Sequence, residues 1–277
     1  MKFFEKLDSL DVRWLYLLLA IVVTIPFFKP FGLPIQVDNM TRQAFDTIES
    51  APPGSYVFLS FDFLPSTLTE NGTQAAIVAR HCFQRNLKVL VGSAESNNEG
   101  VQLAQSIIEP IAKEMNKEYG VDWVNLGFKV GGGLYVRSMI EDIIKANADQ
   151  DFTGKKLSEM PIMQGIKSLK ECEILASFTS LGGALNDFVA YLYSEYGNKV
   201  IAGITGGMIT QYIVYLQSGQ YKGILGGLTG AAQYEFLLGK PGKAIQGMDS
   251  QSAAHALFFV FVVLGNIGFY LKSKKRS

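Results

Sequence analysis

Two nearby segments, GNKVIAGITGGMITQY at residues 197–212 and GILGGLTGAAQY at residues 223–234, decide the predicted fold. In each segment a short apolar run is followed by paired glycines and then by an apolar pattern with helical spacing. Both segments also carry a Thr-Gly step with Gln-Tyr downstream. Junctions of this kind, from a buried strand directly into a helix, are typical of a parallel α/β sheet.

The same alternation runs through the preceding part of the chain. Apolar strand patterns occupy residues 55–61, 87–92, 121–128 and 172–178, and an amphipathic helical pattern follows each of them. A short helix is predicted before the first strand, at residues 39–50. Because strands covered on both faces read as unbroken apolar runs, we predict a doubly wound, mostly parallel α/β sheet of about six strands.

One connection departs from this alternation. Residues 147–170 carry no clear helical or strand period and contain the run PIMQG. Connections this long are unusual in a compact domain unless they fold on themselves or act on a ligand. The sequence therefore predicts either a small inserted subelement or a functional flap here.

Both ends of the chain are predicted to be transmembrane helices that flank the α/β domain. Residues 14–28 are apolar and uncharged, and residues 252–271 form a longer apolar run. The first run is short, since roughly 20 residues span a bilayer, so a signal peptide is the alternative. Bulky and proline-rich residues follow it in place of a cleavage site, which favours an uncleaved anchor. The predicted domain is residues 30–251, between cytoplasmic tails at 1–13 and 272–277.

The basic C-terminal tail sets the predicted orientation. Its residues, Lys272, Lys274, Lys275 and Arg276, follow the second apolar run directly, and basic clusters stay on the cytoplasmic side. Both termini are therefore predicted to be cytoplasmic, and the main domain extracytoplasmic, in a two-span protein of the cell membrane. The lipid bilayer is its first predicted partner.

A polar residue within the second apolar run predicts a further partner. Asn266 lies between Gly265 and Gly268, and small residues beside an amide are typical of contacts between membrane helices. We predict that these three residues contact a helix of another membrane protein subunit, in a homo- or hetero-oligomer. The alternative is an Asn266 hydrated near the inner membrane interface.

Composition excludes several other functions. The chain has 25 basic and 25 acidic residues, and the basic tail leaves the segment between the ends mildly acidic, without the basic stripe that nucleic-acid binding requires. Cys82 and Cys172 fall in apolar patterns, so they are predicted to be buried core residues rather than a disulfide. No Cys or His pair has the spacing of metal ligands, and no glycine loop matches a nucleotide fingerprint, so we predict no metal and no cofactor.

The carboxyl edge of the sheet is the predicted ligand site. Glycines at residues 131–133, 182–183, 206–207 and 226–227 follow predicted strands, and parallel sheets bind ligands at this edge. The polar residues predicted there are Asp62, Ser93, Glu95, Lys129, Thr179, Ser180, Thr205 and Thr229. Because several helix N-termini would converge, we predict a small anionic or zwitterionic ligand. The alternative is that the glycines only let helices pack close to strands.

We assign no catalytic residues. His81 is predicted on the polar edge of a helix and His255 at the membrane edge, which leaves a Ser-His-Asp triad poorly supplied. The predicted function is a non-catalytic scaffold or ligand-sensing subunit of a cell-envelope membrane complex. The alternative is a membrane-bound hydrolase of the peptidase or esterase class, acting on envelope peptides or lipids, with Ser93, Ser180 or Thr205 as its nucleophile.

Overall fold

The computed structural model describes residues 11–95 and 99–276. They form two compact units, Ile35–Lys240 and the described residues at the two ends of the chain. Each unit is treated by itself below.

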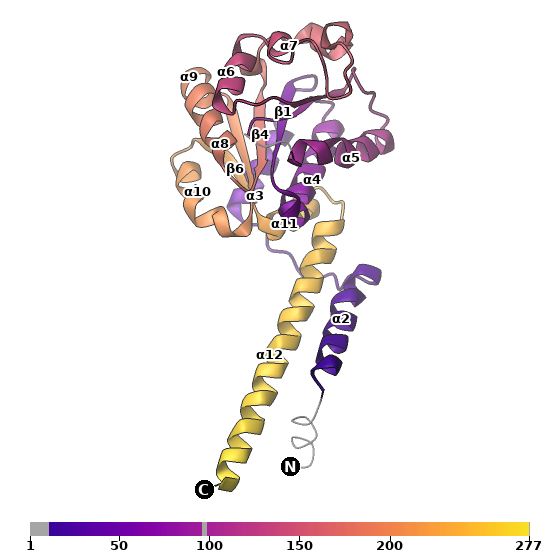
Figure 1. The fold of residues 1–277 in the computed structure, drawn as a ribbon, viewed down its shortest axis with the longest axis vertical. Helices are drawn as coiled ribbons and strands as arrows, with labels where there is room; N and C mark the ends of the chain where they lie inside the picture. Colours follow the sequence, from indigo (N-terminus) through magenta and orange to yellow (C-terminus); the bar gives the residue numbers. More distant parts are fainter. Residues whose placement is uncertain (1–10, 96–98, 277) are drawn as a thin grey trace. The chain divides into compact units, whose positions relative to one another are not determined.

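The unit Ile35–Lys240 is built on a parallel sheet (Figure 1). Its described residues form six strands, all parallel, in the order β3-β2-β1-β4-β5-β6. The strands are β1 (Tyr56–Asp62), β2 (Lys88–Ser93), β3 (Trp123–Phe128), β4 (Ile174–Thr179), β5 (Lys199–Ile204) and β6 (Tyr221–Gly226). The predicted α/β class and the parallel sheet are confirmed, and the strand order is Rossmann-like.

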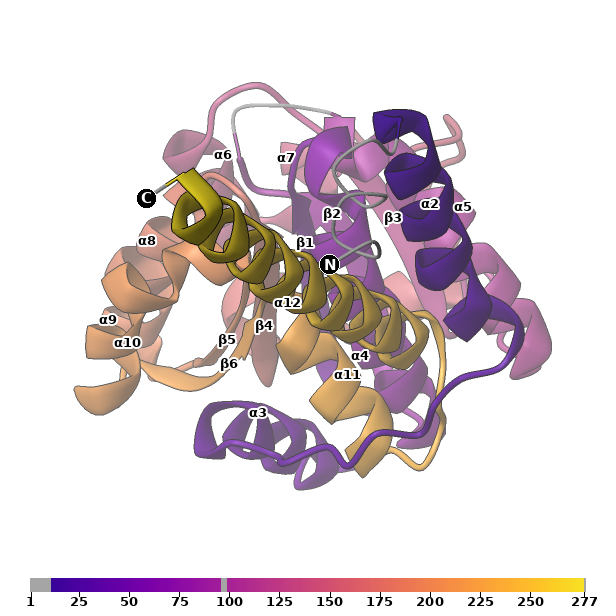
Figure 2. The same cartoon turned by 90° about the horizontal axis from the view of Figure 1, so that it is seen from below.

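Helices cover both faces of this sheet. Figure 2 shows one helical layer on each side of the strands. One layer contains α3 (Asn39–Glu49), α4 (Thr73–Gln84), α5 (Glu99–Glu114) and α11 (Gly227–Leu237). The other contains α6 (Gly133–Glu141), α7 (Ile143–Ala146), α8 (Gly183–Phe188), η6 (Val189–Tyr193), α9 (Ser194–Tyr196) and α10 (Ile209–Gln217).

The strands are apolar throughout because both faces are buried. In β1, Val57, Leu59 and Phe61 point into one core and Phe58 into the other, and none of the four is exposed. Successive side chains of a strand point to opposite faces, so a sheet between two helical layers requires apolar residues at every position. The two cysteines are buried without a disulfide, as the sequence predicted.

The connection at residues 147–170 folds into short 3₁₀ helices. These are η3 (Leu157–Glu159), η4 (Pro161–Gly165) and the start of η5 (Leu169–Glu171). Leu157, Ile162 and Leu169 are at most 1% exposed and join the core on the α6 and α8 side. Of the two alternatives, the packing favours an inserted subelement over a flap.

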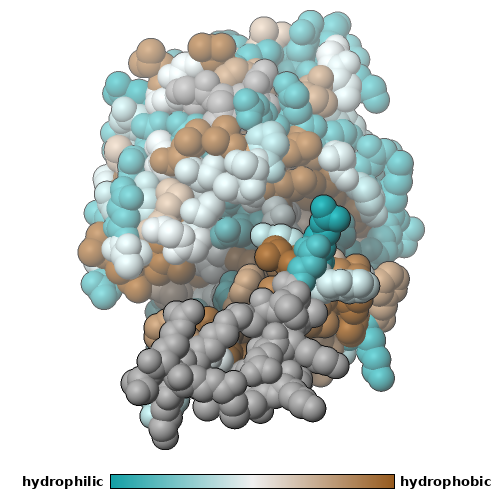
Figure 3. Space-filling model, turned by 60° about the horizontal axis from the view of Figure 1, so that its bottom comes forward, coloured by the Kyte–Doolittle hydropathy of each residue, from teal (hydrophilic) through white to brown (hydrophobic). Residues whose placement is uncertain are grey.

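The outer surface of the α/β unit is mixed in polarity. On the face shown in Figure 3, apolar residues form small groups separated by polar ones. Exposed apolar side chains include Val130 and Leu134 after β3 and Leu181 after β4. Scattered exposed apolar residues of this kind are ordinary on a domain surrounded by water.

The other unit contains two apolar helices, α2 (Val12–Phe28) and α12 (Lys243–Arg276). They contact each other, and Asp249 of α12 accepts hydrogen bonds from the backbone N–H groups of Phe31 and Gly32, at 2.7 and 3.3 Å. Within the described residues, Lys243–Tyr270 is the one helical segment long and apolar enough to cross a membrane, while α2 is shorter. The predicted transmembrane run starts at residue 252, but the helix that contains it, α12, already begins at Lys243.

Candidate functional site

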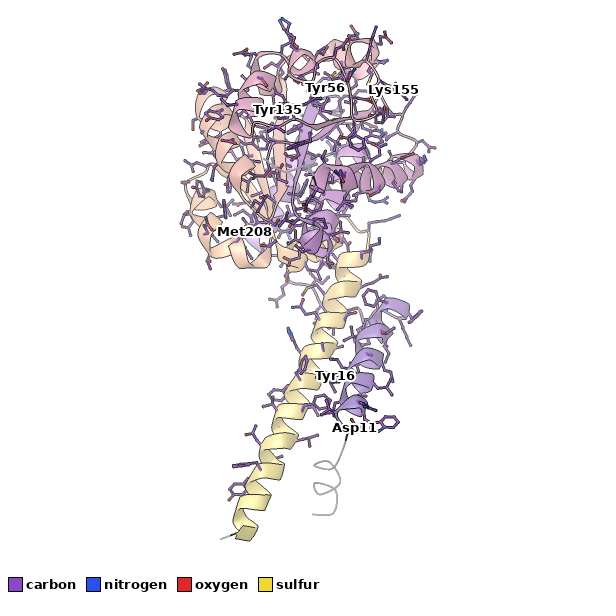
Figure 4. The ribbon with its side chains drawn as sticks, in the orientation of Figure 1. Asp11, Tyr16, Tyr56, Tyr135, Lys155 and Met208 are labelled. Atoms are coloured by element: carbon purple, nitrogen blue, oxygen red, sulfur yellow. The ribbon has the colours of Figure 1, made fainter. Side chains whose placement is uncertain are left out.

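The reversal of strand order between β1 and β4 defines the candidate site. Connections leave β1 toward one side and β4 toward the other, which opens a crevice at their carboxyl ends in folds of this type. The four glycine junctions follow β3, β4, β5 and β6 and therefore lie at this same edge. Figure 4 labels Met208, which follows β5 at this end, and Tyr56, which starts β1 at the opposite end.

Asp62 is the centre of the site. It ends β1 and is completely buried. One carboxylate oxygen, Oδ1, accepts from Ser93 Oγ at 3.0 Å and from the backbone N–H groups of Ala94 and Glu95 at 3.0 and 3.1 Å. The other, Oδ2, accepts from Ser177 Oγ at 2.6 Å. One side chain thus ties together the carboxyl ends of β1, β2 and β4.

Burial raises the pKa of Asp62 to about 6. Hydrogen bonds from Ser177, Ser60 and Ser93 act in the opposite direction and lower it. The negative charge of Glu95 raises the pKa further. Desolvation of the charged form therefore outweighs the hydrogen bonds, and Asp62 takes up a proton in mildly acidic solution.

A second carboxylate, that of Glu95, lies against the start of α8. Its Oε2 accepts from the backbone N–H of Ala184 at 3.1 Å, and a Cβ at Gly183 would collide with its Oε1. Asp187 lies one turn further along α8, where burial and the charge of Glu95 raise its pKa. A Cβ at Gly133 would stand 2.8 Å from Asp187 Oδ1. Glycines at both junctions therefore make room for carboxylates of the chain itself.

The carboxylate of Glu70 likewise lies against the glycine junctions after β5 and β6. Its Oε2 accepts from the backbone N–H of Gly206 at 2.9 Å and would lie 3.1 Å from a Cβ at Gly227. Helix starts attract negative charge, and here a glutamate of the connection between β1 and α4 supplies it. These contacts show that the glycines make room for carboxylates of the chain itself, while a ligand at this edge stays a prediction.

Two buried side-chain amides join the carboxyl ends of β4, β5 and β6. Asn71, in the π-helical turn η2 (Leu68–Gly72), and Gln74, at the start of α4, are completely buried and hydrogen-bonded to each other. Both donate to backbone carbonyls: Asn71 Nδ2 to Thr179 and Gly203, each at 3.2 Å, and Gln74 Nε2 to Ile204, Leu225 and Gly227, at 3.0, 3.1 and 2.9 Å. Sequence reasoning missed this pair, whose only signal is two amides at the start of an apolar helical pattern.

The structure brings some predicted site residues together. Thr179 Oγ1 donates to the backbone carbonyl of Asp62 at 3.2 Å, and Ser180 Oγ accepts from the backbone N–H of Leu64 at 3.1 Å. The residues that gather at the β1–β4 reversal are thus Asp62, Ser93, Glu95, Thr179 and Ser180.

The other predicted residues are separated from this group by the strand order. Lys129 follows β3 and Thr205 follows β5, so each is two strands away from Asp62 on β1. Thr229 lies in the first turn of α11, beyond β6. Neighbouring strands are about 4.8 Å apart, so the three flank the Asp62 centre at about 10 Å or more.

The sequence predicted His81 on the polar edge of a helix, and this prediction is wrong. The side chain is buried, with 1% exposure. Its Nδ1 lies 2.8 Å from the hydroxyl of Tyr234, and its Nε2 lies 2.8 Å from Glu49 Oε2. The ring of Phe45 stacks on it with centroids 4.5 Å apart. Burial lowers the pKa of His81, which favours a neutral imidazole among the helices α3, α4 and α11 of one layer.

Chemically, the site is one buried carboxylate, Asp62, with partly exposed carboxylates around it, held by hydroxyls and backbone N–H groups. Among the described residues, no group of three or more His, Cys, Asp or Glu side chains is arranged to hold a metal ion. In the long helix, Asn266 donates to the carbonyl of Val262 at 2.7 Å and is itself exposed. No protein family, curated protein or solved structure matches this chain.

Proposed function

We propose that this chain is a membrane-anchored subunit whose Rossmann-like domain acts as a non-catalytic scaffold or ligand sensor in a cell-envelope membrane complex. The observation that carries the proposal is α12, which is long and apolar enough to span a bilayer. In a water-soluble protein such a helix would be buried by other elements, whereas Phe259 and Phe269 are 70% and 76% exposed here.

The N-terminal helix is proposed as the second span. Trp14 and Tyr16 are 62% and 68% exposed, on a helix whose remaining residues are almost all apolar. Its 17 residues are few for a perpendicular crossing, but contact with α12 supports a paired arrangement. With the basic residues at the C-terminal end of α12, this arrangement gives cytoplasmic termini and an extracytoplasmic domain.

The exposed face around Asn266 is the proposed contact with another subunit. A Cβ at Gly265 would meet no atom within 4 Å, and Asn266 already satisfies its amide N–H within the helix. Gly265, Asn266 and Gly268 thus leave space for close approach of a second helix, with the Asn266 carbonyl available to accept across the interface.

The burial of Ser93 supports a non-catalytic role for that hydroxyl, whereas Ser180 and Thr205 are half-buried. Ser93 and Ser177 are both completely buried and direct their hydroxyls at the Asp62 carboxylate, away from solvent. His81, the histidine of the α/β unit, is held by Glu49 and Tyr234. The hydrolase alternative would need a substrate to reach these groups, and labelling of Ser93, Ser180 or Thr205 by a hydroxyl-directed activity probe would favour it.

For a sensing role, the carboxylates at the edge favour a zwitterion over a purely anionic ligand. Asp62, Glu95 and Asp187 place negative charge beside the helix starts that would attract an anion. A small ligand with both an ammonium and a carboxylate group satisfies both features.

The subunit proposal predicts a defined assembly. The full chain, extracted in mild detergent and analysed by native mass spectrometry, is expected to give a homo-oligomer or a complex with another membrane protein. Replacing both Gly265 and Gly268 by leucine should release the monomer, because the larger side chains block close helix approach. Leucine in place of Val260 and Val263, which are exposed on the opposite side of the helix, is the control and should keep the assembly. A wild-type chain that is monomeric and alone would contradict the proposal.

A further inference from the structure

A cavity far from the Asp62 centre has features of a ligand site. Its volume is about 270 Å³, and it lies between the second half of α5, the segment entering β3, and the turn at Thr153 and Lys155. Trp123, which lines it, starts β3, whereas Asp62 ends β1 in the parallel sheet. Figure 4 labels Lys155 at the same end of the domain as Tyr56.

Two fixed aromatic rings form one side of this cavity. The rings of Tyr119 and Trp123 are perpendicular, with centroids 4.8 Å apart. The hydroxyl of Tyr119 donates to Asp151 Oδ2 at 2.6 Å, which fixes the ring. Burial and the neighbouring Asp151 raise the pKa of Tyr119, so the phenol stays neutral. The Tyr119 ring is half-buried and Trp123 is only 2% exposed, so the cavity offers a planar group a rigid surface made mainly by Tyr119, with Trp123 behind it.

The cavity is also lined by three lysines. Lys113 forms an ion pair with Glu109, with 2.6 Å between Nζ and Oε1. Lys117 Nζ donates to the neutral amide oxygen of Asn86 at 2.8 Å, and Lys155 Nζ lies 5.7 Å from the centroid of the Tyr119 ring. Within the described part of the chain, neither of these two ammonium groups has an ion-pair partner. Two ammonium groups without a direct ion pair therefore lie at the cavity, although the charge of Lys117 is felt by Asp122, whose pKa it lowers, and Asp151 accepts from the backbone N–H of Lys155.

We propose that this cavity binds a small organic anion with an aromatic ring, such as an aromatic carboxylate. The ring packs against Trp123 and Tyr119, and the carboxylate accepts from Lys117 and Lys155. A volume of about 270 Å³ suits a ligand of one ring rather than a nucleotide or a peptide. This site is independent of the carboxyl-edge ligand and of membrane anchoring.

The test uses three matched probes on the full chain in detergent: 4-(trifluoromethyl)benzoate, the corresponding benzyl alcohol and the corresponding benzylamine. Ligand-observed ¹⁹F NMR measures each dissociation constant. The benzoate is expected to bind about tenfold more tightly than the alcohol, and the amine more weakly still. The double variant Lys117→Gln/Lys155→Gln should lose this preference.

The matched control is Lys156→Gln. Lys156 is adjacent in sequence, pairs with Glu159 at 3.2 Å and does not line the cavity, so this variant should keep the preference. The chain has two tryptophans, and Trp14→Phe leaves the indole N–H signal of Trp123 alone in a ¹H–¹⁵N spectrum. Benzoate should shift this signal. Equal binding of the three probes, a preference that survives in the double variant, or a Trp123 signal that does not move would each overturn the proposal.

Discussion

Replacing Asp62 by alanine is expected to lower the free energy of unfolding by about 3 kcal/mol at pH 4, where the buried carboxyl group is protonated. The change removes the acceptor of the Glu95 backbone N–H and of the hydroxyls of Ser93 and Ser177, all at the buried end of the sheet. It also leaves a void between β1, β2 and β4. Urea unfolding of the full chain in detergent, followed by circular dichroism, measures the loss.

Asp62→Asn is the control for this substitution, and at pH 4 it should cost about 1 kcal/mol or less, because the amide resembles the protonated carboxyl group. The amide oxygen can keep the three donors that face Oδ1, and the hydroxyl of Ser177 can rotate to accept from the new N–H group. A loss as large for asparagine as for alanine would contradict the role of Asp62 as an acceptor.

The free energy of unfolding should also depend differently on pH in the wild-type chain and in Asp62→Asn. The pKa of Asp62 is about 6 in the folded state against 3.8 in the unfolded chain, so the folded state binds the proton more tightly. Its stabilising contribution is fully present below pH 3.8 and is lost as pH rises through 6. The wild-type chain should therefore lose about 3 kcal/mol relative to Asp62→Asn between these limits. Parallel curves for the two chains would contradict the raised pKa.

Gly223→Ala is expected to have an effect of similar size for a different reason. A Cβ at this position of β6 would collide with the backbone N and Cα of Ala44, in the middle of α3. Backbone atoms cannot rotate away as the end of a side chain can, so α3 must move off the sheet. We expect a loss of about 3 kcal/mol and a fall in Tm of roughly 10 °C.

Gly207→Ala is the matched control for Gly223→Ala. It adds the same methyl group next to another strand of the same sheet, but no atom lies within 4 Å of the new Cβ. Its Tm should change by no more than about 2 °C. Equal stability of the two variants would show that α3 does not pack on β6 as described.

The fold could be predicted because its signals are local. Each strand is a short apolar run, each helix has its own period, and glycines mark the junctions at residues 182–183 and 206–207. Regular alternation of strands and helices then restricts the sheet to parallel pairing. Asp62 and Ser93 could be named as site residues on the same ground, because each directly follows a predicted strand and ends the observed one.

The rest of the site could not be predicted because it depends on long-range pairing. Glu70 meets Gly206, and Gln74 meets Leu225, across more than 130 residues of sequence. No local pattern shows that Glu70 will accept from the backbone N–H of Gly206, where the sequence predicted an anionic ligand. His81 was placed wrongly for a related reason, since its partners Glu49 and Tyr234 lie on other helices.

The most direct test of the account is cysteine accessibility in intact cells. The native Cys82 and Cys172 are buried, and burial raises the pKa of both thiols, so a membrane-impermeant maleimide should leave the wild-type chain unlabelled. Lys156→Cys, at an exposed position of the α/β unit, should be labelled from outside, whereas Ser277→Cys should be labelled only after the membrane is opened. Labelling of Ser277→Cys in intact cells, or protection of Lys156→Cys, would contradict a membrane-anchored extracytoplasmic domain with cytoplasmic termini.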